Sequence, residues 1–444
     1  MKGKRADASA SLLHEAEAEA ESESSERGRG RVVVGGSGGG ATWAQTLGNI
    51  VVSIVGTGVL GLPYAFRIAG WLAGSLGVAA AGFATFYCML LLVQCRDKLE
   101  EEEVDNSTHR YTYGDLGGKA FGPVGRYLTE LLILVTQAGG SVAYLVFISH
   151  NLSSIFSARS KYHGISPSVF IFSLLLPVEI ALSFVRSLSS LAPFSMFADV
   201  CNVLAMAIVI KEDLQHFDQA FKSRNAFNGI WGIPFAGGVA VFCFEGFSMT
   251  LALEASMAER RKFRWVLAQA FLGITFAYIC FGIFGYLAYG DETRDIITLN
   301  LPNNWSAAAV KVGLSIALIF TFPTMMHPIH EIVEAKLWSN EWFQKQRRNI
   351  PGAEWSGLHG SRILAVAVLA VLASFIPGFS TFISFVGSTG CALLSFVLPA
   401  AFHLFIMGHT IGFWQRALDY GILITGLAFA GYGTYDVFAS HSSI

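Results

Sequence analysis

Acidic side chains that stand inside long apolar stretches are the residues of this sequence best suited to do chemistry. Glu245 interrupts the apolar run that starts at Ile233, and Asp199 lies in the middle of another. At the centre of a lipid bilayer a charged side chain costs at least ~2.5 kcal/mol, so each one needs a reason to be there. A carboxyl group at that depth can bind and release a proton, or it can fix the backbone by hydrogen bonds. Both roles remain open for Glu245, the structural one is favoured for Asp199, and both residues are candidates for ion coupling.

Hydroxyl and aromatic side chains inside other apolar stretches form a second group of candidates. Thr321 and Thr324 are one helical turn apart and can offer oxygen atoms to a sodium ion. The hydroxyl of Tyr144 can donate a hydrogen bond to a carboxylate. An apolar pocket is expected from three phenylalanines, Phe244, Phe247 and Phe322. Because the sequence contains 36 phenylalanines, packing or lipid contact is the alternative for any one of them.

Two apolar stretches are interrupted at their centre by glycine. The first is VVSIVGTGVLGLP, residues 51–63, and the second is IPFAGGVAVFCFEGF, residues 233–247. A helix that is interrupted at membrane depth exposes backbone N–H and C=O groups, which is tolerated only where they line a cavity or a binding site. The alternative is that these glycines only allow helices to pack closely. Their occurrence as a matched pair favours a transporter's substrate site.

The ends of an interrupted helix present opposite partial charges. Backbone N–H groups at the start of the second half favour a carboxylate, and carbonyl oxygens at the end of the first half favour an ammonium group or a cation. A site with both poles matches the zwitterion of an α-amino acid. The residues expected to contact the substrate at the two interruptions are Ser53, Gly56, Thr57, Gly58, Phe244 and Gly246.

The composition excludes a soluble domain. Of the 444 residues, 53% are hydrophobic and 14% are charged, whereas soluble domains have roughly 25% charged residues. The formal net charge of −2 provides no basic excess for binding nucleic acid. The six cysteines lie in apolar segments without a CxxC pair, which predicts packing roles rather than disulfides or a metal site. Because no metal-ligand spacing, phosphate-binding loop or nucleophile motif occurs, the sequence predicts neither an enzyme nor a cofactor.

Eleven apolar segments are long enough to cross ~30 Å of hydrocarbon as helices, which predicts an all-α polytopic membrane protein. They are 42–66, 69–95, 124–156, 165–185, 188–211, 229–257, 263–290, 305–335, 360–377, 381–408 and 414–438. Residues 1–40 have almost nothing to bury in a packed core and are expected to be a disordered cytosolic tail, with the membrane domain at 41–444. On one side of the predicted bilayer, the tail and loops carry 22 of the 30 Lys and Arg residues, which predicts a cytosolic N-terminus.

The interruptions fall in the first and sixth predicted segments. This is the arrangement expected of two copies of a five-helix unit, at about 42–211 and 229–408. Because five is odd, the second copy enters the membrane from the opposite face, so the repeats are inverted. The segment at about 414–438 is then an extra helix outside the repeat.

Six motifs follow one another in order from about Thr42 to the last helix. They are IVGTGVLGLPYAF at 54–66, QAG at 137–139 with Tyr144, FAD at 197–199, FEG at 244–246, FTFPTMM at 320–326 with Pro328 and Glu331, and LPAAFH at 398–403. With these motifs the chain resembles the amino acid/auxin permease family, and within it the plant vacuolar transporters of neutral and aromatic amino acids. The resemblance implies the leucine-transporter fold, alternating access by a rocking bundle, and coupling to a proton gradient. Glu179 and His330 depart from the family pattern and leave coupling and selectivity open.

The expectation is a monomeric secondary active transporter of neutral, including aromatic, amino acids, which works across a lipid bilayer. Protons rather than sodium are expected to drive it. The vacuolar membrane is the expected location, with the plasma membrane as the alternative. Two other functions remain open: a permease for another small carboxylate such as auxin, and an amino acid sensor that does not transport.

Overall fold

The computed structural model describes residues 41–102, 111–159, 165–184, 201, 204–211, 224–302, 304–349, 353–408 and 410–441. Within these ranges the chain is helical, and its only bridge of the β type joins Ala41 to Met257. The predicted tail at 1–40 and Asp199 lie outside the described residues, as does most of the predicted fifth segment.

The helices follow the predicted apolar segments closely. Their bounds are α2 (Trp43–Ile54), α3 (Leu62–Ala69), α4 (Trp71–Glu102), α5 (Tyr113–Arg159), α6 (Pro167–Phe170), α7 (Leu176–Ser183), α9 (Gly232–Cys243), α10 (Phe247–Ser256), α11 (Phe263–Tyr289), α12 (Trp305–Ser339), α13 (Glu341–Asn349), α14 (Ala353–Ser374), α15 (Phe379–Val386), α16 (Leu398–Ile406) and α17 (Phe413–His441). A 3₁₀ turn, η1 (Thr57–Gly61), separates α2 from α3, and two π-helical turns, η7 (Gly387–Cys391) and η8 (Leu393–Val397), separate α15 from α16.

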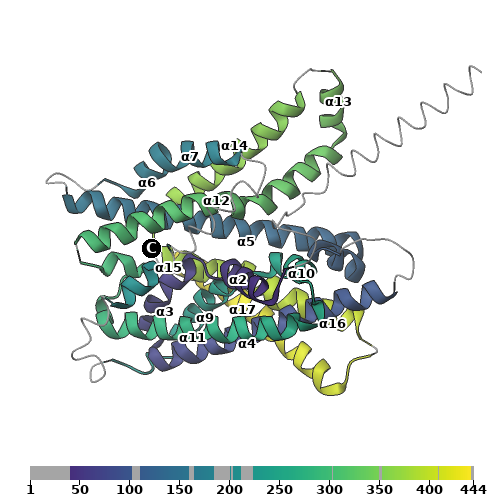
Figure 1. The fold of residues 1–444 in the computed structure, drawn as a ribbon, viewed down its shortest axis with the longest axis horizontal. Coiled ribbons are helices and arrows are strands. Elements are labelled where there is room, and N and C mark those ends of the chain that lie inside the picture. The colour runs from purple at the N-terminus through teal and green to yellow at the C-terminus, as the bar shows by residue number, and fades with distance from the viewer. Residues whose placement is uncertain are drawn as a thin grey trace, which may run out of the picture.

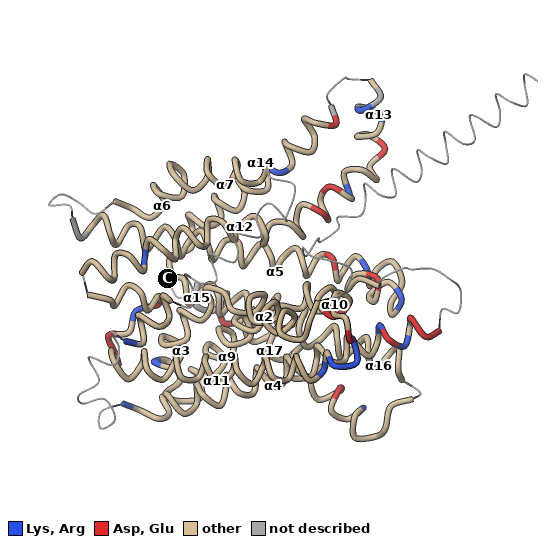
Figure 2. Tube along the Cα trace, in the orientation of Figure 1, with Lys and Arg blue, Asp and Glu red and all other residues tan. Residues whose placement is uncertain are grey.

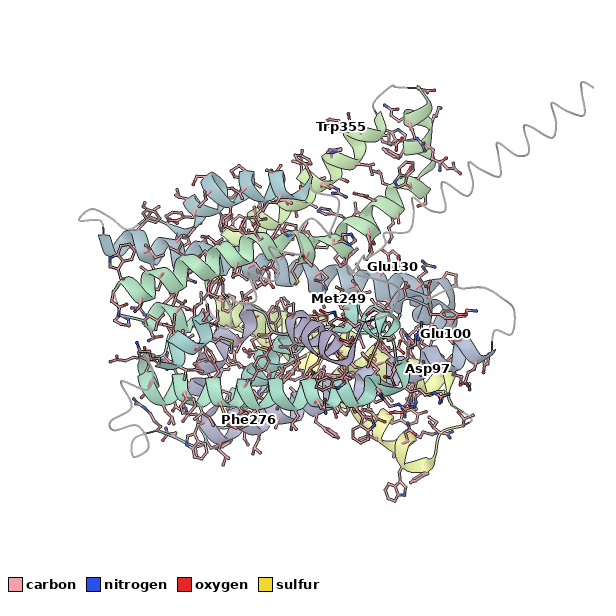
Figure 3. All side chains as sticks on the ribbon, viewed as in Figure 1. Asp97, Glu100, Glu130, Met249, Phe276 and Trp355 are labelled. Carbon is pink, nitrogen blue, oxygen red and sulfur yellow. The ribbon has the colours of Figure 1, made fainter. Side chains whose placement is uncertain are left out.

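Length and composition identify the described helices that can cross a bilayer. Seven of these helices are long and apolar enough to cross a membrane by themselves, and the bent pair Trp43–Ile54 with Thr57–Ala69 makes an eighth if it counts as one span. The helical segment Pro167–Ser183 is apolar but shorter. Large apolar side chains are exposed on the outer faces, as Phe276 of α11 shows with 70% of its surface accessible (Figure 3). Lys, Arg, Asp and Glu gather at the two ends of the bundle and are sparse between them (Figure 2). The protein is therefore an all-helical membrane protein with several spans.

The helices form two neighbouring groups that run nearly parallel. In one group α12 and α14 pack along α5, with α7 against α14; in the other, α9 and α11 pack along α4, with α3 between α9 and α11 (Figure 1). The interrupted helix pairs α2/α3 and α9/α10 belong to the second group. The turn η7 packs against α9 and α17, and η8 packs against α17 and α16.

The crossing of α9 and η7 depends on two glycines. A methyl group at Gly387 would overlap the backbone carbonyl of Gly238, and one at Gly238 would overlap the carbonyl of Ser384. Small residues let membrane helices approach this closely. Gly238 is thus a packing glycine and does not belong to the helix interruption that follows it.

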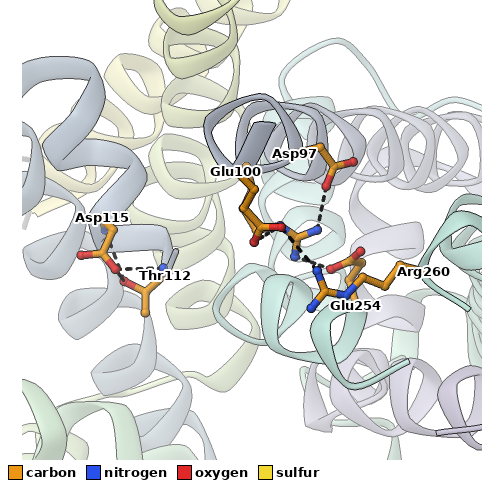
Figure 4. Close-up of polar contacts among 7 residues, drawn as sticks. Asp97, Glu100, Thr112, Asp115, Glu254 and Arg260 are labelled. Atoms are coloured by element: carbon orange, nitrogen blue, oxygen red, sulfur yellow. Dashed lines mark hydrogen bonds and ion pairs between the residues drawn. The ribbon is translucent and has the colours of Figure 1, made fainter. Parts of the chain in front are cut away.

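Ion pairs join α4 to α10 at the end of the bundle that carries α13. The side chain of Arg96 is 2% exposed and pairs with the equally buried carboxylate of Glu254 (Figure 4). Arg96 also lies 2.8 Å from a carboxylate oxygen of Asp97 and 3.4 Å from one of Glu100. Arg260, which is exposed, reaches Glu100 at 3.4 Å.

A backbone strap ties the start of α2 to the end of α10 near these ion pairs. The N–H of Ala41 donates to the carbonyl of Ser256 at 2.8 Å, and the N–H of Ala258 donates to the carbonyl of Ala41 at 3.1 Å. The two interrupted helix pairs are therefore joined through main-chain atoms at one end.

Candidate functional site

The first interruption has a short unwound stretch. α2 ends at Ile54, and Val55 and Gly56 are extended before the turn η1 begins at Thr57. The two halves are bent by 49°. Gly56 has a φ of −119°, so it does not need the left-handed region that favours glycine. Gly58 allows a close approach instead, because a Cβ there would lie 2.9 Å from the Phe242 ring and 3.0 Å from the sulfur of Cys243.

The second interruption faces the first. α9 ends at Cys243 and α10 begins at Phe247, with Phe244, Glu245 and Gly246 between them. A Cβ on Gly246 would lie 3.0 Å from the side chain of Ile54, the last residue of α2. Each interruption thus packs its glycine against the last turn of the opposite half-helix. The prediction that these two stretches are interrupted is confirmed, and the structure brings them together.

The hydroxyl of Tyr278 lies between the two half-helix ends. This buried residue of α11 places its oxygen 3.3 Å from the carbonyl oxygen of Ile54 and 3.2 Å from that of Cys243. A carbonyl oxygen has two lone pairs, so each of the two keeps one for another donor. Tyr278 therefore holds in place the two carbonyls that form the negative pole, a role that no spacing in the sequence pointed to.

One face of α5 covers the interruptions. The hydroxyl of Tyr144 lies 3.6 Å from where a Cβ on Gly56 would be. Two turns earlier, Nε2 of Gln137 donates to the hydroxyl of Ser248 in the first turn of α10, at 3.0 Å. Ser141 lies between them on the same face, since residues three, four and seven apart align on a helix. The motif around Gln137 was visible in the sequence, but its alignment with Tyr144 depends on the helix.

Several buried polar atoms around the interruptions have no hydrogen-bond partner among the described residues. They are the Oγ1 of Thr57, the Oε1 of Gln137, the Oγ of Ser141 and the Oε1 of Glu245. A buried polar group without a partner costs roughly 1–3 kcal/mol, so a cluster of them is unusual in a packed interior. Such a cluster is suited to a polar ligand.

Glu245 lies between the two halves of the second interruption. Its carboxyl group has a hydrogen bond with the backbone of Phe247, where α10 begins. The carboxylate also lies within electrostatic range of Cys391 in η7. Glu245 is therefore in contact with the unwound backbone, which suits either of the two roles considered for it.

Other predicted residues use their polar or aromatic groups elsewhere. The hydroxyl of Ser53 donates to the carbonyl of Ile50, and that of Thr321 donates to Ala317. The ring of Phe244 stacks on Phe271 at 5.8 Å between centroids, and so packs against α11. Three further candidates lie on neighbouring helices. Phe247 is fully buried at the start of α10. Phe322 and Thr324 lie on α12, which packs along α5.

No group of three or more His, Cys, Asp or Glu residues that could hold a metal ion occurs in the described part of the chain. The polar groups that the described residues bring to the two interruptions are backbone N–H and C=O groups, hydroxyls, an amide and one carboxyl group. The family described as "Transmembrane amino acid transporter protein" matches residues 39–439. The chain belongs to this family. It is a transporter family, so the protein is not an enzyme.

Relatives in this family cover nearly the whole chain. The amino acid transporter ANT1 of Arabidopsis thaliana is 58% identical over 409 residues, which are 90% of this chain and 93% of that protein. The Arabidopsis amino acid transporter AVT3B is 40% identical over 88% of this chain and 92% of its own. Vacuolar amino acid transporter 4 of Saccharomyces cerevisiae (strain ATCC 204508 / S288c) is 27% identical, over 87% of this chain and 56% of its own.

Solved transporter structures share the fold. Mhp1 in its inward-facing conformation superposes with a TM-score of 0.57 at 12% identity, over 88% of this chain and 89% of its own. MhsT in complex with L-phenylalanine gives a TM-score of 0.52 at 13% identity, over 90% and 99%. Both have the leucine-transporter fold. The family member described here is thus an all-helical membrane protein of that fold class.

Proposed function

We propose that this protein is a secondary active transporter of neutral amino acids, aromatic ones included, and that the substrate binds where the two interrupted helices face each other. The single observation that carries the proposal is the mutual packing of the two interruptions, Gly58 against Cys243 and Gly246 against Ile54. It brings the carbonyl pole and the N–H pole of two half-helices to one place. The names of the Arabidopsis relatives as amino acid transporters agree with a zwitterionic substrate.

In this proposal the substrate's two charged groups bind at opposite poles. The carboxylate would accept hydrogen bonds from N–H groups at the start of η1 and from the hydroxyl of Tyr144. The ammonium group would donate to the carbonyls of Ile54 and Cys243, each of which keeps a free lone pair beside the Tyr278 hydroxyl. Ser53, Gly56, Thr57, Gly58, Phe244, Gly246, Phe247 and Phe322 complete the proposed substrate-binding set.

The architecture proposed with this function has eleven spans. Residues 42–211 and 229–408 form the two inverted repeats, 414–438 is the extra helix, and 1–40 is a cytosolic tail. The end of the bundle with Arg96, Arg260 and α13 is then cytosolic, in agreement with the positive-inside rule. We place the protein in the vacuolar membrane as a monomer, where it exports amino acids from an acidic lumen to the cytosol.

The proposed coupling ion is the proton. Glu245 is the proposed carboxyl group at the substrate site, and Asp199 is a second candidate in the undescribed part of the chain. A sodium ion bound by Thr321 and Thr324 is the alternative; the Thr321 hydroxyl already donates to its own helix. The acidic lumen of a vacuole supplies the proton gradient that this direction of transport requires.

The test is uptake by full-length protein reconstituted in proteoliposomes, with labelled amino acids and an imposed pH or sodium gradient. Labelled neutral amino acids are expected to accumulate when a pH gradient is imposed and not when a sodium gradient is. Unlabelled amino acids are expected to compete, whereas their amides and keto acids, which lack one pole of the zwitterion, are not. Flux that ignores both gradients would overturn the coupling, and strong competition by keto acids would overturn the zwitterion site.

The Tyr144→Phe variant tests the carboxylate pole. A hydrogen bond to a charged group contributes roughly 1.5–3 kcal/mol, so its loss is expected to raise KM about 10- to 100-fold. The measurement is the concentration dependence of uptake, with Tyr420→Phe as the control because that tyrosine is exposed on α17. An unchanged KM in Tyr144→Phe would remove this tyrosine from the site.

A further inference from the structure

A histidine and an aspartate form a fully buried pair outside the helix interruptions. The Nδ1 of His403 on α16 lies 2.7 Å from a carboxylate oxygen of Asp419 on α17, and both side chains are 0% exposed. The hydroxyl of Tyr87 on α4 donates to the other oxygen of Asp419 at 2.8 Å. Gln415, one turn before Asp419, also has a hydrogen bond with Tyr87. Three helices thus supply one polar cluster inside the protein.

One ring nitrogen of this cluster has no hydrogen-bond partner among the described residues. With the carboxyl group of Asp419 ionised, the Nδ1 of His403 carries a proton and donates it to one carboxylate oxygen, and the other oxygen accepts from Tyr87. The Nε2 of His403 is buried and has no partner in the part of the chain that the structure describes. When Nε2 binds a proton, the imidazolium and the carboxylate together have no net charge; when it releases the proton, the pair has a charge of minus one.

The helix that carries His403 is weakened just before it. The π-helical turns η7 and η8 precede α16, and such turns are rare and are frequently found at functional sites. The hydroxyl of Tyr113 donates to the carbonyl of Leu394 within η8 at 2.5 Å. The polar cluster therefore adjoins a stretch where the regular α-helical hydrogen bonding is interrupted.

Other titratable groups that face the pair come from α4 and α5. Cys88 and Cys95 of α4 lie within electrostatic range of Asp419. Lys98, one turn further along α4, donates to the carbonyl of Ile406 at 3.1 Å, at the end of α16. From α5, the ring of Tyr113 packs edge-on against Phe402 at 5.9 Å. Lys98, the one cation of this set, directs its ammonium group to that carbonyl and to the carboxylate of Glu102 at 3.7 Å, so Asp419 is the partner of His403.

We propose that His403 and Asp419, held by Tyr87, form a proton-binding site through which the pH gradient drives transport. This rests on the proposed function, because it assumes a proton-coupled transporter. The pair is connected to the interrupted helices through α4, which carries Tyr87, packs along α9 and α11, and holds α10 by the Arg96 pair. Through Asp419, the helix α17, which lies outside the two proposed repeats, contributes to the proposed coupling of proton movement to transport.

The experiment compares gradient-driven accumulation with exchange in proteoliposomes that contain the full chain. With one proton per substrate, a gradient of ~1 pH unit supports about tenfold accumulation in the wild type. His403→Gln and Asp419→Asn are expected to lose this accumulation while they still exchange labelled for unlabelled substrate without a gradient. The control is His359→Gln, since that histidine on α14 is only partly buried and stacks on Trp355, away from the pair.

Glu245→Gln in the same assay separates the two sites. Because Glu245 contacts the unwound backbone, its variant is expected to weaken exchange as well as accumulation. His403→Gln that accumulates substrate like the wild type would overturn the proposal. If neither His403→Gln nor Asp419→Asn folds, Tyr87→Phe is used instead, because it leaves the His403–Asp419 pair in place. This variant is expected to shift the pH profile of uptake, and an unshifted profile would overturn the proposed proton-binding site. A wild type that ignores the pH gradient would instead refute the proposed proton coupling itself.

Discussion

The Arg96→Met variant is expected to be less stable than the wild type by about 3–5 kcal/mol, because it leaves the buried carboxylate of Glu254 without its partner. Removal of one member of a buried ion pair costs far more than the pair contributes, since the remaining charge is desolvated and uncompensated. Glu254→Gln is expected to cost less, because Arg96 keeps Asp97 and Glu100 as partners. The double variant is expected to recover part of the loss of Arg96→Met.

Thermal unfolding of the purified protein in detergent measures this order of stabilities. The matched control is Arg260→Met, which removes an exposed pair with Glu100 and is expected to change stability by less than about 1 kcal/mol. If Arg96→Met and Arg260→Met have the same unfolding midpoint, the pair between α4 and α10 does not stabilise the fold.

The Gly387→Ala variant is expected to fail to give folded protein. Overpacking an interior usually costs about 1–3 kcal/mol, and the cost is higher when the neighbour is backbone that cannot turn away. Here the added methyl group would overlap the carbonyl of Gly238, so α9 and η7 would have to separate along their whole contact. The yield of monodisperse protein in size-exclusion chromatography measures the effect.

Gly273→Ala is the control for this variant, because nothing lies within 4 Å of a Cβ at that helical position. It is expected to match the wild type in yield. Normal yield from Gly387→Ala would mean that the two helices have room between them that the structure does not show.

The interruptions could be predicted because glycine and proline mark them locally in otherwise apolar runs. The residues that complete the site could not be predicted in the same way. Tyr278 stands in an apolar helix where only the rotation of α11 decides whether its hydroxyl faces lipid or the ends of α2 and α9. Ser53 was expected at the site because of its position, but its hydroxyl bonds to its own helix, which is the usual partner for serine within a helix.

The contact between His403 and Asp419 could not be predicted from the sequence either. Asp419 lies in the predicted segment 414–438 but was not singled out from the sequence, whereas His403 belongs to the motif LPAAFH at 398–403. Their contact depends on the turn between α16 and α17 and on the rotation of both helices. The separation of sixteen residues between His403 and Asp419 predicts neither of these. Apolar patterns in this sequence predict where the helices are, whereas the contacts between their polar groups depend on how the helices pack.

The strap between Ala41 and the end of α10 has a mechanical consequence. Its hydrogen bonds use main-chain atoms, so at positions 41 and 258 only proline, which has no N–H, would remove a donor. The chain before Ala41 is therefore attached at a point shared by both interrupted helix pairs. A force applied to that chain, for example by a bound protein, would act on both interrupted helix pairs together.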